Sequence, residues 1–259
     1  MGYLSKSQFE LIIIKRFKKE GIIMKRIFVN TDGLGDWRKK LADPVKHWKR
    51  EKSAFECAVS WESAKRTGHG LPNKIRRILN KSEKFKKGEL LLAIPEHQVP
   101  LKPSGRGSQN DVWTLIKFKH DIFSVSVEAK AGEDFDDTVI DWLNKDEKKA
   151  GRKERLKFLK TILQIEHAET DNVRYQLLHR AVSAILEARR FRTDGAMMII
   201  QSFSDSDKFD DFANFCNLFG IKAERNIAFR VESFKEMPLY FCWIDCEIAS
   251  NAKVARAVE

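Results

Sequence analysis

The sequence predicts a mixed α/β or α+β fold in which helices surround one central sheet. The first observation behind this prediction is the order of the patterns, because β-rich runs alternate with helical ones along the chain. The second is the length of 259 residues, which suffices for one sizeable core. The third is a composition of 42% hydrophobic and 33% charged residues, which is ordinary for a globular protein. There is no run of about 18 or more apolar residues, so we expect no membrane span and a cytoplasmic location.

We expect residues 1–23 to form a basic extension outside the core. Their short apolar patch is followed by lysines and arginines and not by a small-residue cleavage site, which argues against a secretory signal. Residues 22–29 form an apolar run before a turn, which predicts a short strand. We therefore expect a single domain over residues 24–249 and a C-terminal tail at 250–259 that carries no chemistry.

The next part of the chain predicts short helices with many basic residues. Residues 36–41 indicate a helical turn. Ser53 is a favourable N-cap for a helix over residues 54–65, in which apolar residues recur at helical spacing. Residues 72–79 predict a further helix, and the lysine-rich stretch 81–87 predicts an exposed loop.

The middle of the chain predicts three strands. Residues 89–99 contain an apolar run typical of a buried strand, and a loop rich in Pro, Gly and Ser follows at 100–109. Residues 111–119 and 122–130 are β-rich runs separated by a short turn, which indicates a hairpin. Apolar and polar residues alternate over 123–128, so we expect the second strand to be half-buried.

Helices dominate the second half of the chain. The clearest covers residues 173–191, where apolar residues recur on one face. The other predicted elements are helices at 138–148, 152–165 and 209–219, and strands at 196–203 and 239–244.

Basic residues are concentrated in the first third of the chain. The whole sequence has a net charge of +11, and residues 1–90 hold 23 Lys and Arg against 10 Asp and Glu, a net +13. The rest of the chain is therefore close to neutral. A basic segment of this kind suits a polyanion such as nucleic acid, although an ordinary solvated basic surface explains the charge equally well.

The four cysteines show no metal-binding spacing. None belongs to a CxxC pair, and no pair of histidines at zinc-finger spacing lies nearby. We expect buried, reduced thiols. They are Cys57, Cys216, Cys242 and Cys246.

Three charged residues of the predicted hairpin form the strongest chemical signal. Asp111 begins one strand and Glu128 lies near the end of its antiparallel partner, so the two carboxylates converge at one end of the hairpin. Lys130 shares a face with Glu128, because side chains at i and i+2 of a strand point the same way, while Ala129 points to the packed face. Two carboxylates suit Mg²⁺ or Mn²⁺, and an adjacent ammonium group can orient a water molecule and stabilise charge. The alternative is a salt-linked strand end of little energetic value.

These residues resemble the core of the PD-(D/E)XK nuclease superfamily, in which an Asp opens one hairpin strand and Glu/Asp-x-Lys lies on the next. The resemblance implies a restriction-endonuclease-like fold, with a central mixed β-sheet flanked by helices, and Mg²⁺-dependent hydrolysis of phosphodiester bonds. The chain also resembles an uncharacterised bacterial family assigned to this superfamily, over about residues 24–245. The similar segments are LLAIPEHQVPL, QNDVWTL, RYQLLHR and MIIQSF.

The resemblance implies further site residues. Many members of the superfamily add an acidic metal ligand from the first helix, and Glu62 is the preferred candidate here, with Glu56 as the alternative. Its RecB-like branch uses Gln-x3-Tyr on the helix after the hairpin. This chain has Gln176 at the first position and Arg180 in place of the Tyr.

Four side chains are candidates for contact with a nucleic-acid phosphate. His179 and Arg180 lie on the predicted helix 173–191, and guanidinium groups bind phosphate bidentately. Arg106 and Ser108 lie in the loop just before Asp111. The acidic residues at 133–137 would repel a phosphate backbone, and we expect them to cap the helix that begins near residue 138.

Two functions of different classes follow. One is a Mg²⁺-dependent or Mn²⁺-dependent endonuclease that acts on DNA, with a role in anti-phage defence or DNA repair by analogy with the superfamily. A homodimer is a further option, because such enzymes often pair to cut both strands. The other is a non-catalytic nucleic-acid-binding or regulatory module on the same fold.

Overall fold

The computed structural model describes residues 33–258, apart from 42, 104, 106, 146–148 and 204–207. The predicted N-terminal extension and the strand at 22–29 therefore lie outside the described residues.

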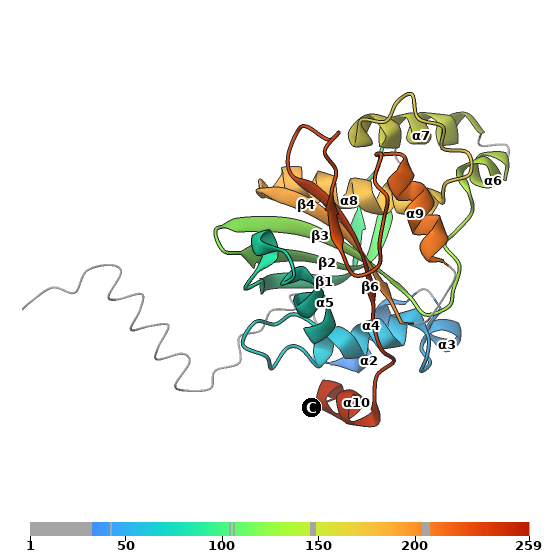
Figure 1. Ribbon diagram of the computed structural model, residues 1–259. Coiled ribbons are helices and arrows are strands. Elements are labelled where there is room, and N and C mark those ends of the chain that lie inside the picture. Colours follow the sequence, from blue (N-terminus) through green and yellow to red (C-terminus); the bar gives the residue numbers. More distant parts are fainter. Residues whose placement is uncertain are drawn as a thin grey trace, which may run out of the picture.

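The described residues form one six-stranded mixed sheet with the strand order β1-β2-β3-β4-β6-β5 (Figure 1). Strands β1, β2 and β3 are antiparallel, β3, β4 and β6 are parallel, and β5 pairs antiparallel with β6. Helices flank the sheet, which confirms the predicted α+β class. The strands are β1 (Glu89–Val99), β2 (Ser108–Phe118), β3 (Asp121–Lys130), β4 (Gly195–Ser202), β5 (Ala228–Arg230) and β6 (Leu239–Asp245).

The sheet divides the core into two clusters, and helices cover the cluster on each face. Figure 1 shows α8 running across the sheet, with α6, α7 and α9 near it and with α2, α3, α4 and α10 at the opposite end of the view. Residues of α2, α4, α5 and α10 belong to one cluster, and residues of α7, α8 and α9 belong to the other. The helices are α2 (Leu34–Lys40), α3 (Pro44–His47), α4 (Ser53–Glu62), α5 (Asn73–Leu79), α6 (Val139–Asn144), α7 (Lys149–Leu163), α8 (Tyr175–Phe191), α9 (Phe209–Asn217) and α10 (Asn251–Val258), with a 3₁₀ turn η1 (Glu83–Phe85).

Strand β3 lies inside the sheet and is buried on both faces, so the prediction of a half-buried strand is wrong. Its apolar residues pack toward α4, and its polar residues face α8 instead of water. The hydroxyls are satisfied there: Ser126 donates to the carbonyl of Arg180 at 3.0 Å, and Ser124 accepts from the indole of Trp113 at 2.9 Å. The alternating pattern thus marks two different packed surfaces, because a second layer of helices covers the polar face.

Helix capping also differs from the prediction. Ser53 is the first residue of α4, and its backbone N–H donates to the carboxylate of Glu133 at 3.1 Å. An acidic side chain from the loop after β3 therefore neutralises the positive N-terminus of α4. Helix α6, which the acidic run was expected to cap, begins after Thr138, whose hydroxyl accepts from the backbone N–H of Asp141.

Four elements were not anticipated, and the first of them is the short helix α3. The lysine-rich stretch predicted as an exposed loop contains η1, where Phe85 is 1% exposed and packs edge-on against Phe118, Phe123 and Tyr240. Strand β5 adds a short edge to the sheet. The predicted tail contains α10, which packs against α4.

Candidate functional site

The hairpin brings Asp111, Glu128 and Lys130 to one end of the sheet. Val112 pairs with Val127 in the antiparallel register, so Asp111 lies opposite Glu128. The side chains of Glu128 and Lys130 share the face toward α8, and Nζ of Lys130 lies 3.1 Å from Oε1 of Glu128. Ala129, between them, is buried in the core on the other face. The arrangement therefore matches the expected geometry of the motif.

Asp111 bridges the two strands at this end. Its Oδ2 accepts a hydrogen bond from the backbone N–H of Ala129 at 2.6 Å. Burial raises the pKa of Asp111 well above its ordinary value, and the negative charges of Glu128 and Glu96 raise it further. The charge of Arg180 and the Ala129 hydrogen bond oppose these effects without cancelling them. Among the residues that the structure describes, no cation forms an ion pair with this carboxyl group.

Glu128 is held by three donors. Oε1 accepts from Nε2 of Gln176 at 2.8 Å, and Oε2 accepts from Nε of Arg180 at 2.5 Å. Burial acts to raise the pKa of Glu128, but the charges and hydrogen bonds of Arg180 and Lys130 outweigh it and hold the pKa below its ordinary value. Glu128 is consequently ionised at neutral pH although it is only 3% exposed.

Lys130 is fixed by its own set of contacts. Nζ donates to Oε1 of Gln176 at 2.9 Å and to the carbonyl of Asp134 at 3.3 Å. It also lies 4.8 Å from the centroid of the Phe135 ring. Gln176 therefore contacts both residues of the Glu-x-Lys motif and fixes the position of one relative to the other.

Arg180 connects this cluster to Ser108 and His179. Nη1 of Arg180 donates to the hydroxyl of Ser108 at 2.9 Å, and that hydroxyl also lies 2.8 Å from Nδ1 of His179. Burial lowers the pKa of His179 far below its ordinary value, and the nearby charges of Arg180, Arg155 and Lys130 lower it further. The imidazole is therefore neutral, and Ser108 is a buried connector that is only 1% exposed.

Glu96 is the acidic residue that sequence reasoning missed. The β1–β2 register pairs Pro95 with Val112 and His97 with Asn110, which places Glu96 opposite Asp111. Burial and the charge of Glu128 raise its pKa to about 7, although a hydrogen bond from Gln109 at 2.6 Å lowers it. Its φ of 55° is unusual for a non-glycine residue, and such conformations concentrate at functional sites. Strands β1 and β2 have equal lengths and are joined by the loop 100–107. Pairing them residue by residue away from that loop would have placed Glu96 opposite Asp111.

The two candidate glutamates of α4 lie apart from this cluster. Oε1 of Glu62 accepts from the indole N–H of Trp37 at 2.7 Å, and the carboxylate is paired with Lys65. Glu56 accepts from the backbone N–H groups of Glu51 and Ala249. Among the described residues, no three His, Cys, Asp or Glu side chains are gathered closely enough to hold one metal ion. Glu62 therefore does not join Asp111 and Glu128, because its carboxylate is used to tie α4 to α2.

The donor set at the end of the hairpin nevertheless fits a hard divalent cation. Asp111 and Glu128 lie opposite each other on paired strands, and oxygen ligands of this kind are those that Mg²⁺ prefers. Mutual repulsion with Glu128 and Glu96 contributes to the raised pKa of Asp111. A bound cation would remove that repulsion. The two motif carboxylates, with water or substrate oxygens completing the shell, are the residues that would hold it.

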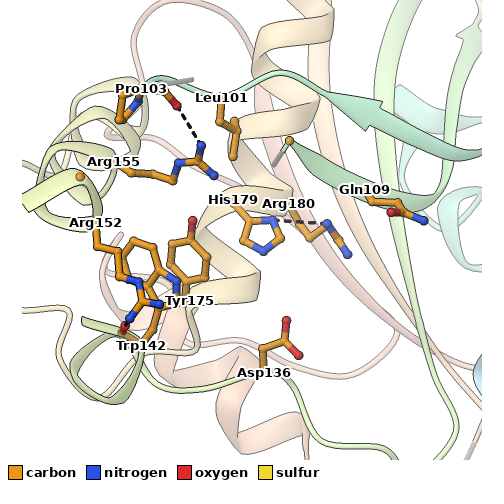
Figure 2. A pocket seen from close by; sticks show the side chains of 12 residues that line it. Leu101, Pro103, Gln109, Asp136, Trp142, Arg152, Arg155, Tyr175, His179 and Arg180 are labelled. Carbon is orange, nitrogen blue, oxygen red and sulfur yellow. Dashed lines mark hydrogen bonds between the residues drawn. The ribbon is translucent and has the colours of Figure 1, made fainter. Parts of the chain in front are cut away.

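A cavity of about 650 Å³ lies next to Arg180, the partner of Glu128, and its described lining does not include Asp111, Glu128 or Glu96. Figure 2 shows Arg155 and Arg180 on two sides of it, Tyr175 and Trp142 on a third and Asp136 below. Arg180 and His179, two of the predicted phosphate contacts, line this cavity, whereas Ser108 does not and Arg106 lies outside the described residues. The described residues that line it are Leu101, Pro103, Gly107, Gln109, Asp136, Trp142, Gly151, Arg152, Arg155, Tyr175, His179 and Arg180.

Burial raises the pKa of the Cys57 thiol well above its ordinary value, and the charges of Asp111, Glu96 and Glu128 raise it further. All four cysteines are free, with Cys57, Cys216 and Cys242 buried as predicted and Cys246 partly exposed. Within the described ranges, no helix has the length and apolar character needed to cross a membrane.

Comparison with known proteins gives one match. A family model described as "Domain of unknown function (DUF6946)" matches residues 30–248. Neither the curated proteins nor the solved structures contain a match to the chain.

Proposed function

Because the chain belongs to the DUF6946 family, whose description assigns no activity, we propose from the site itself that the protein is a metal-dependent nuclease of the PD-(D/E)XK type. The observation that carries this proposal is the cluster at the end of the hairpin. Asp111 and Glu128 lie opposite each other on paired strands, and Lys130 lies 3.1 Å from Glu128 on the same face. The restriction-endonuclease-like fold belongs to the same proposal.

Each residue has a distinct role in hydrolysis of a phosphodiester bond. Asp111 and Glu128 would hold Mg²⁺ or Mn²⁺, which when bound supplies positive charge next to the phosphate. Lys130 would orient the attacking water and stabilise charge that develops on the phosphoryl oxygens. Gln176 positions Glu128 and Lys130 through its two hydrogen bonds, and so acts through them. The water oxygen forms the new P–O bond and gives up one proton to solvent. The bond to the leaving sugar oxygen breaks, and that oxygen takes up one proton from solvent.

Gln176 supports the likeness to the RecB-like branch, whereas Arg180 departs from the pattern of that branch. The branch has Gln-x3-Tyr on this helix. Here Gln176 contacts both Glu128 and Lys130, and Arg180 stands in place of the Tyr and forms an ion pair with Glu128. DNA is the proposed substrate, in defence against foreign DNA or in DNA repair, and a homodimer would allow both strands to be cut. A cytoplasmic setting is part of the same proposal and fits four free thiols.

The test is cleavage of plasmid and single-stranded DNA with Mg²⁺ or Mn²⁺, compared with EDTA. We expect cleavage by the wild type that EDTA stops. Asp111→Asn and Lys130→Met should each reduce the rate about a hundredfold or more, because both remove groups that act on the reacting atoms. Lys117→Met is the matched control, since Lys117 is exposed toward the other end of the same hairpin. Equal rates for all four proteins, or no cleavage of either DNA, would contradict the proposal.

One observation favours the alternative of a non-catalytic binding module. Both oxygens of Glu128 already accept hydrogen bonds, from Gln176 and from Arg180, and Arg180 pairs with it at 2.5 Å. In that case Glu128 would serve to orient Arg180 toward a phosphate. DNA binding without metal-dependent cleavage, weakened by Arg180→Gln, would support this alternative.

A further inference from the structure

The cavity next to Arg180 has a lining that the hydrolytic roles leave unexplained. We propose that it binds one unpaired nucleotide of the substrate strand, with the phosphate held by its arginines and the base against its aromatic and apolar wall. This inference rests on the proposed function and names the form of its substrate.

The arginines of the cavity come from two helices and lie on two sides of it. Arg152 and Arg155 come from α7, and Arg180 comes from α8 (Figure 2). A hydrogen bond to the carbonyl of Pro103, at 2.8 Å, orients Arg155. Arg180 is only 6% exposed and is oriented by its hydrogen bond to Glu128. The charges of Arg180 and Arg155 add to burial in lowering the pKa of His179, which indicates a positive field here. Guanidinium groups in such an arrangement suit phosphate.

The aromatic and apolar lining residues lie beside the arginines of α7: Arg152 is 5.6 Å from the centroid of the Trp142 ring, and Arg155 donates to the carbonyl of Pro103. The rings of Trp142 and Tyr175 are stacked with centroids 3.8 Å apart and planes 11° apart, and Leu101 also lines the cavity. Asp136 is the one carboxylate among the described lining residues, and it can accept a hydrogen bond from the amino group of a base. Aromatic surfaces and arginine planes are the usual supports for unstacked bases.

The size and position of the cavity favour a single nucleotide. A volume of about 650 Å³ is within the usual range for small-ligand sites. A base inside a duplex is stacked and paired, so it reaches such a hollow only when it is unpaired or flipped out. Arg180 both lines the cavity and binds Glu128, so a nucleotide there would place its strand next to the proposed catalytic carboxylates.

The test measures binding in the absence of hydrolysis. Full-length Asp111→Asn without divalent metal is titrated into a labelled single-stranded oligonucleotide and, separately, into its blunt duplex, with fluorescence anisotropy as the readout. We expect Arg155→Ala and Trp142→Ala, added to that background, to weaken single-strand binding about tenfold or more, with a smaller effect on the duplex. Arg155→Lys and Trp142→Phe should keep most of the affinity, which separates loss of contact from loss of folding. Arg230→Ala is the control, because Arg230 is exposed on strand β5.

The outcomes separate the inference from the proposed function. Unchanged single-strand affinity in the Arg155 and Trp142 variants, or an equal loss for the duplex, would overturn the inference even if the wild type cleaves DNA. A wild type that never cleaves, but whose single-strand binding depends on both residues, would overturn the nuclease and leave the inference standing. A mononucleotide that binds more tightly than the oligonucleotide would show that the cavity serves a free nucleotide and would also overturn it.

Discussion

At the scale of single residues, the three neighbouring carboxylates differ because, within the described part of the chain, only Glu128 has cations in contact. Glu128 is paired with Arg180 and Lys130, and its pKa is lowered. Asp111 and Glu96 carry the cost of burial and of repulsion from Glu128, and their pKa values are raised. Uncompensated negative charge therefore lowers the stability of the metal-free fold at the place where a divalent cation is proposed to bind. Functional sites commonly reduce stability in this way.

This difference predicts that Asp111→Asn stabilises the metal-free protein at high pH. Folding raises the pKa of Asp111 above its ordinary 3.8. The protonated carboxyl group therefore contributes favourably to the free energy of unfolding below that pH, and this contribution is lost as pH rises through the folded-state pKa. One pKa unit corresponds to about 1.4 kcal/mol, and 1 kcal/mol shifts Tm by roughly 2–4 °C in a domain of this size. We expect a Tm several degrees higher than wild type near about pH 8 and little difference near about pH 4.

Thermal unfolding with and without Mg²⁺ measures this effect. Added Mg²⁺ should raise the Tm of the wild type but not that of Asp111→Asn, because a ligand stabilises only the fold that binds it. Asp121→Asn, at the other end of β3, is the control. A lower Tm for Asp111→Asn near about pH 8 would contradict the assignment of Asp111 as a strained, uncompensated carboxylate.

At the scale of elements, helix α8 builds the site by delivering its polar side chains at successive turns to one face. Gln176 and Arg180 are four residues apart and both reach Glu128, while the apolar residues of α8 pack into the core on that side of the sheet. Removing Arg180 alone would leave Glu128 buried without its main partner, which typically costs about 3–5 kcal/mol. The helix is thus both a core element and the support of the motif.

Helix α10 gives a prediction at the same scale. Ala257 is fully buried where α10 packs beside α4, whereas the next residue, Val258, is 66% exposed. Ala257→Glu should destabilise the fold by about 1–3 kcal/mol, because a buried unpaired charge forces the helix to detach. Val258→Glu, a matched change one position on, should alter stability by less than about 0.5 kcal/mol. Urea denaturation of both variants measures this, and equal midpoints would show that α10 does not pack against α4.

At the scale of the whole molecule, the charge of +11 concerns association with a polyanion and not the fold. Residues 1–90 carry a net +13, and part of that charge lies outside the described residues. The arginine-lined cavity beside the hairpin belongs to the later, nearly neutral part of the chain. General attraction to phosphates and the local contacts of the site therefore come from different parts of the sequence.

This separation predicts a strong salt dependence of DNA binding. Each phosphate neutralised should add about −0.7 for single strands, or −0.9 for duplex, to the slope of log affinity against log salt. We expect the affinity of Asp111→Asn for duplex DNA to fall at least about tenfold between roughly 50 and 200 mM salt. For single strands, Arg155→Ala should make the slope of log affinity against log salt less negative by about 0.7, the contribution of one phosphate. Binding that does not respond to salt would contradict a polyanion as the partner.

The sequence by itself determined the features that depend on local spacing. Alternation and turn signals predicted the hairpin, and the spacing of Glu128 and Lys130 placed both on one face, which the structure bears out. The long helix over 173–191 and the strand over 196–203 were found within about two residues of their ends in the structure, Tyr175–Phe191 and Gly195–Ser202. These predictions succeed because period and reach are properties of neighbouring residues in one element.

Only the tertiary structure decided which side chains lie next to the motif. It placed Glu96 opposite Asp111, turned Arg180 onto Glu128 and used Glu62 to bind Trp37. It also covered the polar face of β3 with α8. The physical reason is that burial and charge compensation are set by strand order and by which helix covers each face, and residues far apart in the chain make those contacts.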